Sequence, residues 1–189
     1  MGILLSFMPF VLFAMIDRWV GVVPALAAGA ALSAGFVLRD WLWRRRGVKL
    51  LELGMLALFG GLTLFGMLLR PDWPLAAVRL RLDAGLLLIM LVSLGIGRPF
   101  TLQYAREQVP AAAWTSPLFL RANRIITAVW VACFLVIVAT DLLLLHVREI
   151  PANVAMSATA TALIVAVVFT AWYPAHLRGQ RPAARGLAD

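Results

Sequence analysis

The stretch IITAVWVACFLVIVATDLLLL, residues 125–145, decides the fold of this chain. It runs for 21 residues and carries one charge, Asp141. A hydrocarbon core about 30 Å thick needs about 20 helical residues to cross it, so the stretch predicts a transmembrane helix. Similar apolar stretches occupy residues 19–38, 50–69, 77–97 and 154–172. The sequence therefore predicts an all-α fold, a polytopic transmembrane helix bundle of five to six spans.

The composition supports the same class. Hydrophobic residues make up 63% of the chain and charged residues 14%, which is typical of an integral membrane protein. The spans and their short loops use nearly all of the 189 residues, so we predict one integral membrane domain over residues 1–189. The net charge of +8 does not indicate nucleic acid binding here, because membrane proteins retain positive residues in their cytoplasmic loops.

The apolar segment at residues 3–16 has more than one interpretation. No basic residue precedes it, and Asp17 and Arg18 follow it, which reverses the charge order of a signal peptide. At 14 residues it is short for a full crossing. It could span, re-enter, or lie in the interface with Phe7, Phe10 and Phe13 in lipid. We favour an uncleaved membrane segment.

Basic residues are distributed unequally between the two sides of the membrane. Alternating the loops assigns twelve of them to one side, namely Arg39, Arg44, Arg45, Arg46, Lys49, Arg98, Arg106, Arg121, Arg124, Arg178, Arg181 and Arg185. The other side receives five, namely Arg18, Arg70, Arg79, Arg81 and Arg148. Because basic loops stay in the cytoplasm, we predict that the richer side and the C-terminus are cytoplasmic.

Small residues at steps of four predict close helix packing. Ala25, Gly29 and Ser33 share one face of the second segment, and Ala158 and Ala162 lie in the last. Because lipid gives no hydrophobic driving force for helix pairing, helices in a membrane associate through close packing. Faces of small residues allow this, since they let two backbones approach. Packing within one bundle explains both faces, and a homo-oligomer seam is the alternative.

Ionisable residues at membrane depth are costly and are candidate functional residues by default. Arg79 and Asp83 are four apart and can pair on one helix face. With Arg81 and Asp141 they form a polar group toward the outer leaflet. One interpretation is mutual neutralisation with snorkelling. The other is a ligand-binding site, for a headgroup or a proton, made by these four residues.

The cytoplasmic segment at residues 97–124 interleaves aromatic and basic residues. Its candidate residues are Arg98, Phe100, Tyr104, Arg106, Trp114, Arg121 and Arg124. This pattern is typical of a segment on an anionic leaflet, with arginines on phosphates and aromatic rings in the interface. A partner-docking loop is the alternative interpretation.

Motifs of catalysis and metal binding are absent from the sequence. The two histidines, His146 and His176, fall on opposite predicted sides, and no Cys/His/carboxylate cluster has the spacing of metal ligands. Gly60 and Gly61 lie within an apolar helix, so they do not predict a phosphate loop. We therefore predict no enzyme activity, no catalytic residue, no metal and no cofactor.

Four short segments stand out: FMPFVLF at residues 7–13, FGGLTLF at 59–65, RPF at 98–100, and the return from Asn123 to AVW at 128–130. They resemble segments of the intracellular septation protein A family of bacterial inner-membrane proteins. Length and span order also agree. The resemblance implies a multi-pass protein of the bacterial inner membrane with a role in cell-envelope integrity or septation. It supplies no catalytic residues.

These observations predict a non-enzymatic membrane scaffold that acts through a partner. The expected partners are membrane lipids and other envelope or division proteins, not nucleic acid. The alternative is a small transporter or lipid translocator that uses the cluster Arg79, Arg81, Asp83 and Asp141.

Overall fold

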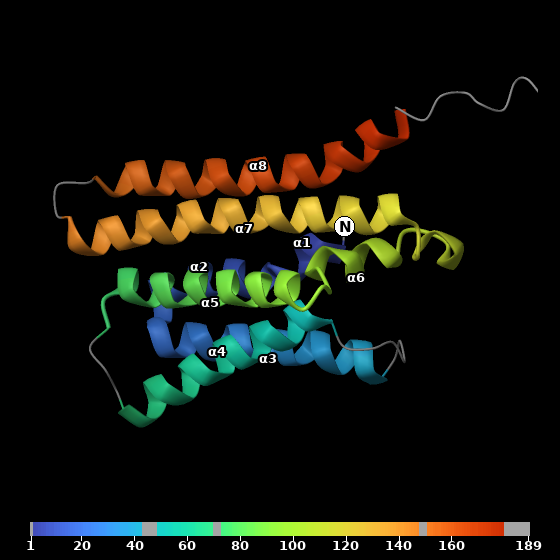
Figure 1. The fold of residues 1–189 in the computed structure, drawn as a ribbon. Helices are drawn as coiled ribbons and strands as arrows, with labels where there is room; N and C mark the ends of the chain where they lie inside the picture. The colour runs from blue at the N-terminus through green and yellow to red at the C-terminus, as the bar shows by residue number, and fades with distance from the viewer. Residues whose placement is uncertain (1, 43–48, 70–72, 148–150, 180–189) are drawn as a thin grey trace, which may run out of the picture.

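The computed structural model describes residues 2–42, 49–69, 73–147 and 151–179, and these parts of the chain form helices and no strand (Figure 1). In chain order the elements are α1 (Gly2–Ser6), α2 (Met8–Val20), α3 (Val22–Leu42), α4 (Leu50–Leu69), α5 (Leu75–Gly95), α6 (Phe100–Arg106), a 3-10 turn η1 (Ala111–Ala113), α7 (Pro117–His146) and α8 (Ala152–Gly179). The predicted all-α class is confirmed.

Four of the described helices are long and apolar enough to cross a membrane: Val22–Leu42, Leu50–Leu69, Pro117–His146 and Asn153–Gly179. Helices α7 and α8 extend beyond the predicted spans at 125–145 and 154–172. Helix α5 has 21 residues but carries three charged side chains, Arg79, Arg81 and Asp83. The chain is therefore compatible with a multi-pass membrane protein with at least these four apolar helices.

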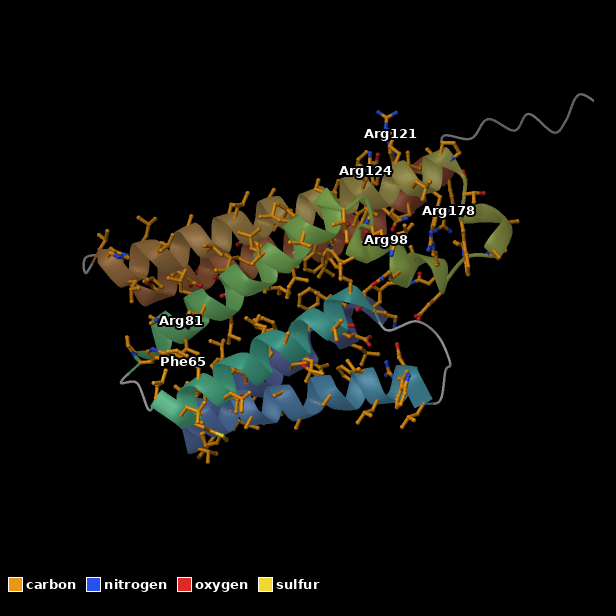
Figure 2. All side chains as sticks on the ribbon, turned by 60° about the horizontal axis from the view of Figure 1, so that its bottom comes forward. Phe65, Arg81, Arg98, Arg121, Arg124 and Arg178 are labelled. Carbon is orange, nitrogen blue, oxygen red and sulfur yellow. The ribbon has the colours of Figure 1, made fainter. Side chains whose placement is uncertain are left out.

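Successive long helices run in opposite directions (Figure 1). Helix α3 packs against α2 and α4, and α7 packs against α5 and α8. Figure 2 shows Arg98, Arg121, Arg124 and Arg178 gathered toward one end of the bundle, with Arg81 and Phe65 toward the other. We call the first the basic end. Of the other predicted basic residues, Arg44, Arg45, Arg46, Arg70, Arg148, Arg181 and Arg185 lie outside the described residues.

The first apolar segment forms α1 and α2 and belongs to the bundle. Phe7, between the two helices, stacks on Trp130 of α7 with ring centroids 5.0 Å apart. Phe10 and Phe13 make edge contacts with Phe59 of α4, at 5.2 and 6.3 Å. The alternative in which these three rings lie in lipid is therefore wrong, because they pack on aromatic rings from other helices.

Glycines let the central helices approach one another, as the small-residue pattern predicts. A Cβ atom on Gly29 would lie 2.5 Å from Cδ1 of Phe59. Between α4 and α5 the contacts are reciprocal, because a Cβ on Gly54 would meet Ile89 at 2.7 Å and one on Gly85 would meet Leu58 at 2.4 Å. Each large side chain thus fills the space above a glycine, and the close packing that results stabilises the helix contacts in lipid.

The outer faces of the helices remain apolar while the middle is filled. Leu68 is 80% exposed, and Leu64 and Ile164 are each 62% exposed, as expected of side chains that face lipid. Inside, Trp130 is fully buried and donates a hydrogen bond from Nε1 to Oγ1 of Thr170 at 2.9 Å. This bond satisfies the one polar atom of the indole in an apolar setting.

Candidate functional site

The predicted cluster near the opposite end assembles in part. Helices α5 and α7 pack together, and they bring Arg79 and Asp83 to Asp141. The distance from Nη2 of Arg79 to Oδ1 of Asp141 is 3.8 Å, so the two groups form a loose ion pair. The Asp83 carboxyl is within hydrogen-bonding reach of Asp141.

Asp141 is 3% exposed, and its Oδ2 has no hydrogen-bond partner among the described residues. Helices α5 and α7 therefore place two carboxyl groups next to each other, with the Arg79 guanidinium as the nearby positive charge.

Replacing Asp141 with asparagine tests how much its long ion pair with Arg79 contributes to stability. Asparagine keeps the shape of the side chain and can donate a hydrogen bond to Asp83, so we expect the free energy of unfolding to change by no more than about 1 kcal/mol. Unfolding in detergent, followed by circular dichroism, measures the change, with Asp17→Asn on α2 as the control. A loss of about 3–5 kcal/mol, the cost of breaking a buried ion pair, would show instead that the Arg79–Asp141 pair is a strong contact between α5 and α7.

Arg81, the fourth predicted member of this cluster, does not join it. Its guanidinium lies 4.7 Å from the ring centroid of Trp73, and Nη1 donates to the carbonyl of Ala77 at 2.7 Å. Trp73 in turn stacks on Phe65 of α4, with centroids 5.1 Å apart. The prediction that Arg81 belongs to a site with Asp141 is wrong, because a cation–π contact holds it on the aromatic pair.

The aromatic residues predicted for the membrane interface at the basic end divide into two groups. Phe100 is fully buried and packs edge-on against Trp130 at 6.2 Å, and Tyr104 is 2% exposed. The prediction that Phe100 and Tyr104 lie in the membrane interface is wrong, because α6 points both side chains toward the interior of the bundle. Trp114 is exposed and lies 5.5 Å below the guanidinium of Arg106, as an interface residue would.

Arg98, Arg121 and Arg124 remain exposed at the basic end, and Arg178 of α8 lies at the same end (Figure 2). The backbone beneath them is fixed by buried hydroxyl groups. Thr101 of α6 donates to the carbonyl of Asn123 at 2.9 Å and lies 2.8 Å from Oγ1 of Thr127. The arginines are therefore presented on a firmly packed part of the chain.

Beside them, at the same end, lies an ion cluster with a buried centre, most of which the sequence did not predict. Lys49 is its centre: Nζ is 3.2 Å from Oδ2 of Asp40, 3.4 Å from Oε1 of Glu52 and 3.1 Å from Oε1 of Glu107. Asp40 also pairs with Arg39 at 3.0 Å. The cluster thus joins the end of α3, the start of α4 and the segment after α6.

Tyr104 and Ser6 complete the cluster on its apolar side. The Lys49 ammonium lies 4.8 Å from the Tyr104 ring centroid. Ser6 donates to Oε1 of Glu52 at 3.5 Å and lies 2.8 Å from the Tyr104 hydroxyl, which therefore acts as donor to Ser6. Burial raises the pKa of Tyr104 above its usual range, and the nearby Glu52 and Glu107 carboxylates act in the same direction. The phenol therefore keeps its proton at neutral pH.

The pKa of Lys49 reports the balance of forces in the cluster. Burial lowers it, but the hydrogen bond to Glu107 and the charges of Glu52 and Asp40 outweigh burial and raise it above 10.5. A raised pKa means that protonation of Lys49 stabilises the fold, and this contribution is fully present below pH 10.5 as long as the partner carboxylates are ionised. That stabilisation is lost only as the pH rises through the raised value.

Only part of this cluster was detectable in the sequence. Glu52 stands three residues after Lys49, within one helical turn, which predicts their contact. Asp40 and Glu107 come from distant positions, and nothing in the sequence marks them as neighbours of Lys49. Gln103, which accepts a hydrogen bond from the Leu50 amide at 2.8 Å, shows that α6 docks here on the start of α4.

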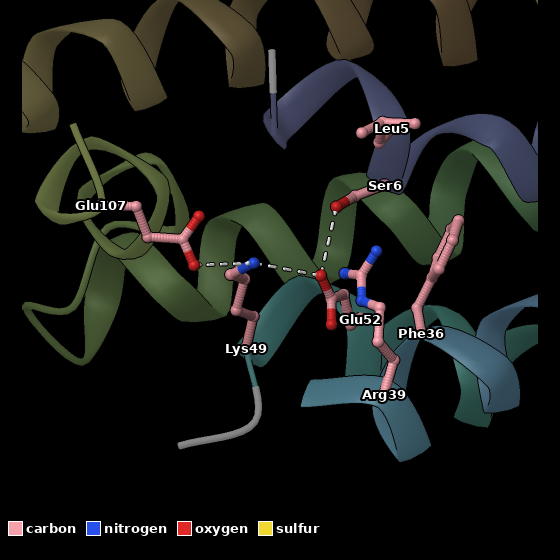
Figure 3. Close-up of a pocket in the computed structure, with 7 residues that line it drawn as sticks. All are labelled: Leu5, Ser6, Phe36, Arg39, Lys49, Glu52 and Glu107. Atoms are coloured by element: carbon pink, nitrogen blue, oxygen red, sulfur yellow. Dashed lines mark hydrogen bonds and ion pairs between the residues drawn. The ribbon is translucent and has the colours of Figure 1, made fainter. Parts of the chain in front are cut away.

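A cavity of about 200 Å³ opens beside the cluster. Figure 3 shows its lining residues, which are Leu5, Ser6, Phe36, Arg39, Lys49, Glu52 and Glu107. The described residues contain no group of three or more His, Cys, Asp or Glu side chains suited to a metal ion. The walls of the cavity carry charged side chains of both signs next to the apolar side chains of Leu5 and Phe36.

Comparison with known proteins adds no identification. The chain matches no protein-family model, no curated protein and no solved structure. The resemblance to the septation family accordingly stays a prediction, and function has to be argued from the geometry.

Proposed function

We propose that this chain is a non-enzymatic scaffold of the bacterial inner membrane, with a role in cell-envelope integrity or septation. It crosses the membrane six times, with α1 and α2 together as the first crossing and α5 as the fourth. Its basic end lies in the cytoplasm. The excess of arginine at that end supports the orientation, because basic segments are retained on the cytoplasmic side.

The observation that carries the scaffold proposal is the filled middle of the bundle. Phe59, Leu86, Met90 and Trp130 are each at most 1% exposed there. A carrier needs room for its substrate near the midplane. Closely packed aromatic rings suit a rigid body that holds its cytoplasmic end in a fixed shape for a partner.

A second candidate function, a small proton-coupled carrier or lipid translocator, is favoured by one observation. The half-buried Asp83 and the buried Asp141 form a carboxyl pair at membrane depth, and Oδ2 of Asp141 has no partner in the described structure. Intramembrane carboxylates of this kind mark proton relays in pumps and transporters.

One complementation experiment separates the two candidates. Deletion of the gene from its source bacterium is expected to impair division or sensitise the envelope, as scored by cell length and detergent sensitivity. A scaffold carrying Asp141→Asn restores growth as well as the wild type, because the substitution leaves the fold intact. Failure of this variant at wild-type protein level supports the carrier. A deletion strain with normal division and a normal envelope contradicts the proposed role.

A further inference from the structure

One side chain that lines the cavity at the basic end, Glu52, has a carboxylate oxygen without a hydrogen-bond partner in the described part of the chain. Glu52 is 2% exposed and lines the cavity, and its Oε2 has no hydrogen-bond partner among the described residues. Both of its described polar contacts, with Ser6 and Lys49, use the other oxygen, Oε1 (Figure 3). A buried polar atom left unmatched is destabilising, so it indicates a missing donor.

The chemistry of the walls specifies what that donor is. A carboxylate oxygen accepts hydrogen bonds and prefers a charged donor. Arg39 also lines the cavity; it uses Nε and Nη2 on Asp40, which leaves further guanidinium N–H groups, and its side chain is 34% exposed. Guanidinium groups bind phosphate. Leu5 and Phe36 add apolar wall.

We propose that this cavity binds a primary ammonium group on Oε2 of Glu52, and that the ammonium belongs to a phosphoethanolamine headgroup whose phosphate lies on Arg39. The volume is sufficient: about 200 Å³ far exceeds the roughly 30 Å³ that one water molecule occupies. The apolar side chains of Leu5 and Phe36 fit the start of the lipid's glycerol and acyl portion. The site is independent of the scaffold and carrier proposals.

Lipid retention by the wild-type protein provides the first test. The full chain is placed in nanodiscs that contain equal amounts of phosphatidylethanolamine and phosphatidylcholine. Native mass spectrometry of the released protein then measures which of the two lipids stays bound. Phosphatidylcholine has the same charges but no N–H donor on its nitrogen. We expect about tenfold preferential retention of phosphatidylethanolamine, which corresponds to about 1.4 kcal/mol, because its nitrogen can donate a hydrogen bond to a charged acceptor. The mono- and dimethylated lipids should fall between.

The variant Glu52→Gln tests the residue. It keeps the size of the side chain and removes the charge, so the preference for phosphatidylethanolamine over phosphatidylcholine should fall about tenfold, toward one. Asp17→Asn, which removes a carboxylate charge on α2 at the far end of the bundle, is the matched control and should keep the preference. If Glu52→Gln does not insert into the membrane, the retention of the mono- and dimethylated lipids by the wild-type protein still tests whether the lipid nitrogen donates a hydrogen bond.

Two further arms separate the sources and the rivals. Free ethanolamine or O-phosphoethanolamine that displaces the lipid at millimolar concentration would assign the site to a soluble amine instead of a lipid headgroup. Preferential retention of phosphatidylglycerol, which has a phosphate but no ammonium, would overturn the proposal. Equal retention of phosphatidylethanolamine and phosphatidylcholine by the wild type would overturn it too.

Discussion

Substitution of Lys49 by methionine is expected to lower the free energy of unfolding by about 3–5 kcal/mol, the cost of removing one partner from a buried ion pair. Lys49 is 6% exposed, and its Nζ lies within 3.4 Å of the Asp40, Glu52 and Glu107 carboxylates. Methionine matches its length and removes the positive charge from all three of these ion pairs. The measurement is unfolding in detergent micelles, followed by circular dichroism.

A second substitution shows that the loss is electrostatic. Adding Glu52→Gln to Lys49→Met removes a buried carboxylate that had paired with the lost ammonium, so the double variant should recover part of the lost stability. Arg124→Met removes a basic residue from the exposed surface of the same end and should stay within about 0.5 kcal/mol of wild type. A Lys49→Met protein as stable as wild type would contradict the central place of this lysine.

Gly29→Val is expected to disrupt the contact between α3 and α4. Even a single added Cβ would lie 2.5 Å from Cδ1 of Phe59, and Phe59 is fully buried with Phe10 and Phe13 against its ring. The ring cannot give way freely, so the helices must separate. Overpacking of this kind costs about 1–3 kcal/mol, and β-branched valine adds further crowding.

Gly35→Val on the same helix is the matched control, because a Cβ there has nothing within 4 Å. Both variants make the same change of residue type, so helix propensity cancels in the comparison. Unfolding in detergent should place Gly29→Val well below Gly35→Val in stability. Equal effects at the two positions would mean that α3 and α4 do not pack as closely as Gly29 and Phe59 indicate.

The features predicted correctly from sequence are those that depend on local spacing. The steps of four from Ala25 to Ser33 predict a packing face, and all three small residues are buried. Arg79 and Asp83, one turn apart, were correctly expected beside Asp141, since an intramembrane charge seeks a partner at the same depth. Periodicity and depth along the chain are sufficient for such predictions.

Contacts between distant segments could not be predicted in the same way. Arg81 was grouped with Asp141 by position, but the nearby ring of Trp73 holds it elsewhere. Tyr104 was expected at the interface, and it is buried because α6 folds back so that the tyrosine reaches Ser6, 98 positions away. The mixture of aromatic and basic residues in such a segment predicts that it lies at a surface. It does not show which of its aromatic rings will be buried when the segment packs against the rest of the bundle.

Accessibility of the two ends of α5 tests the proposed six-crossing topology most directly, because this helix carries three charges and is not among the four clearly apolar ones. Cys133 is the chain's one cysteine and is buried, so a Cys133→Ala background allows single labels at Leu75→Cys and Arg98→Cys. A membrane-impermeant maleimide should label Leu75→Cys from the outer side and Arg98→Cys from the cytoplasmic side. Labelling of both positions from the same side would contradict a crossing by α5 and the six-helix membrane bundle with it.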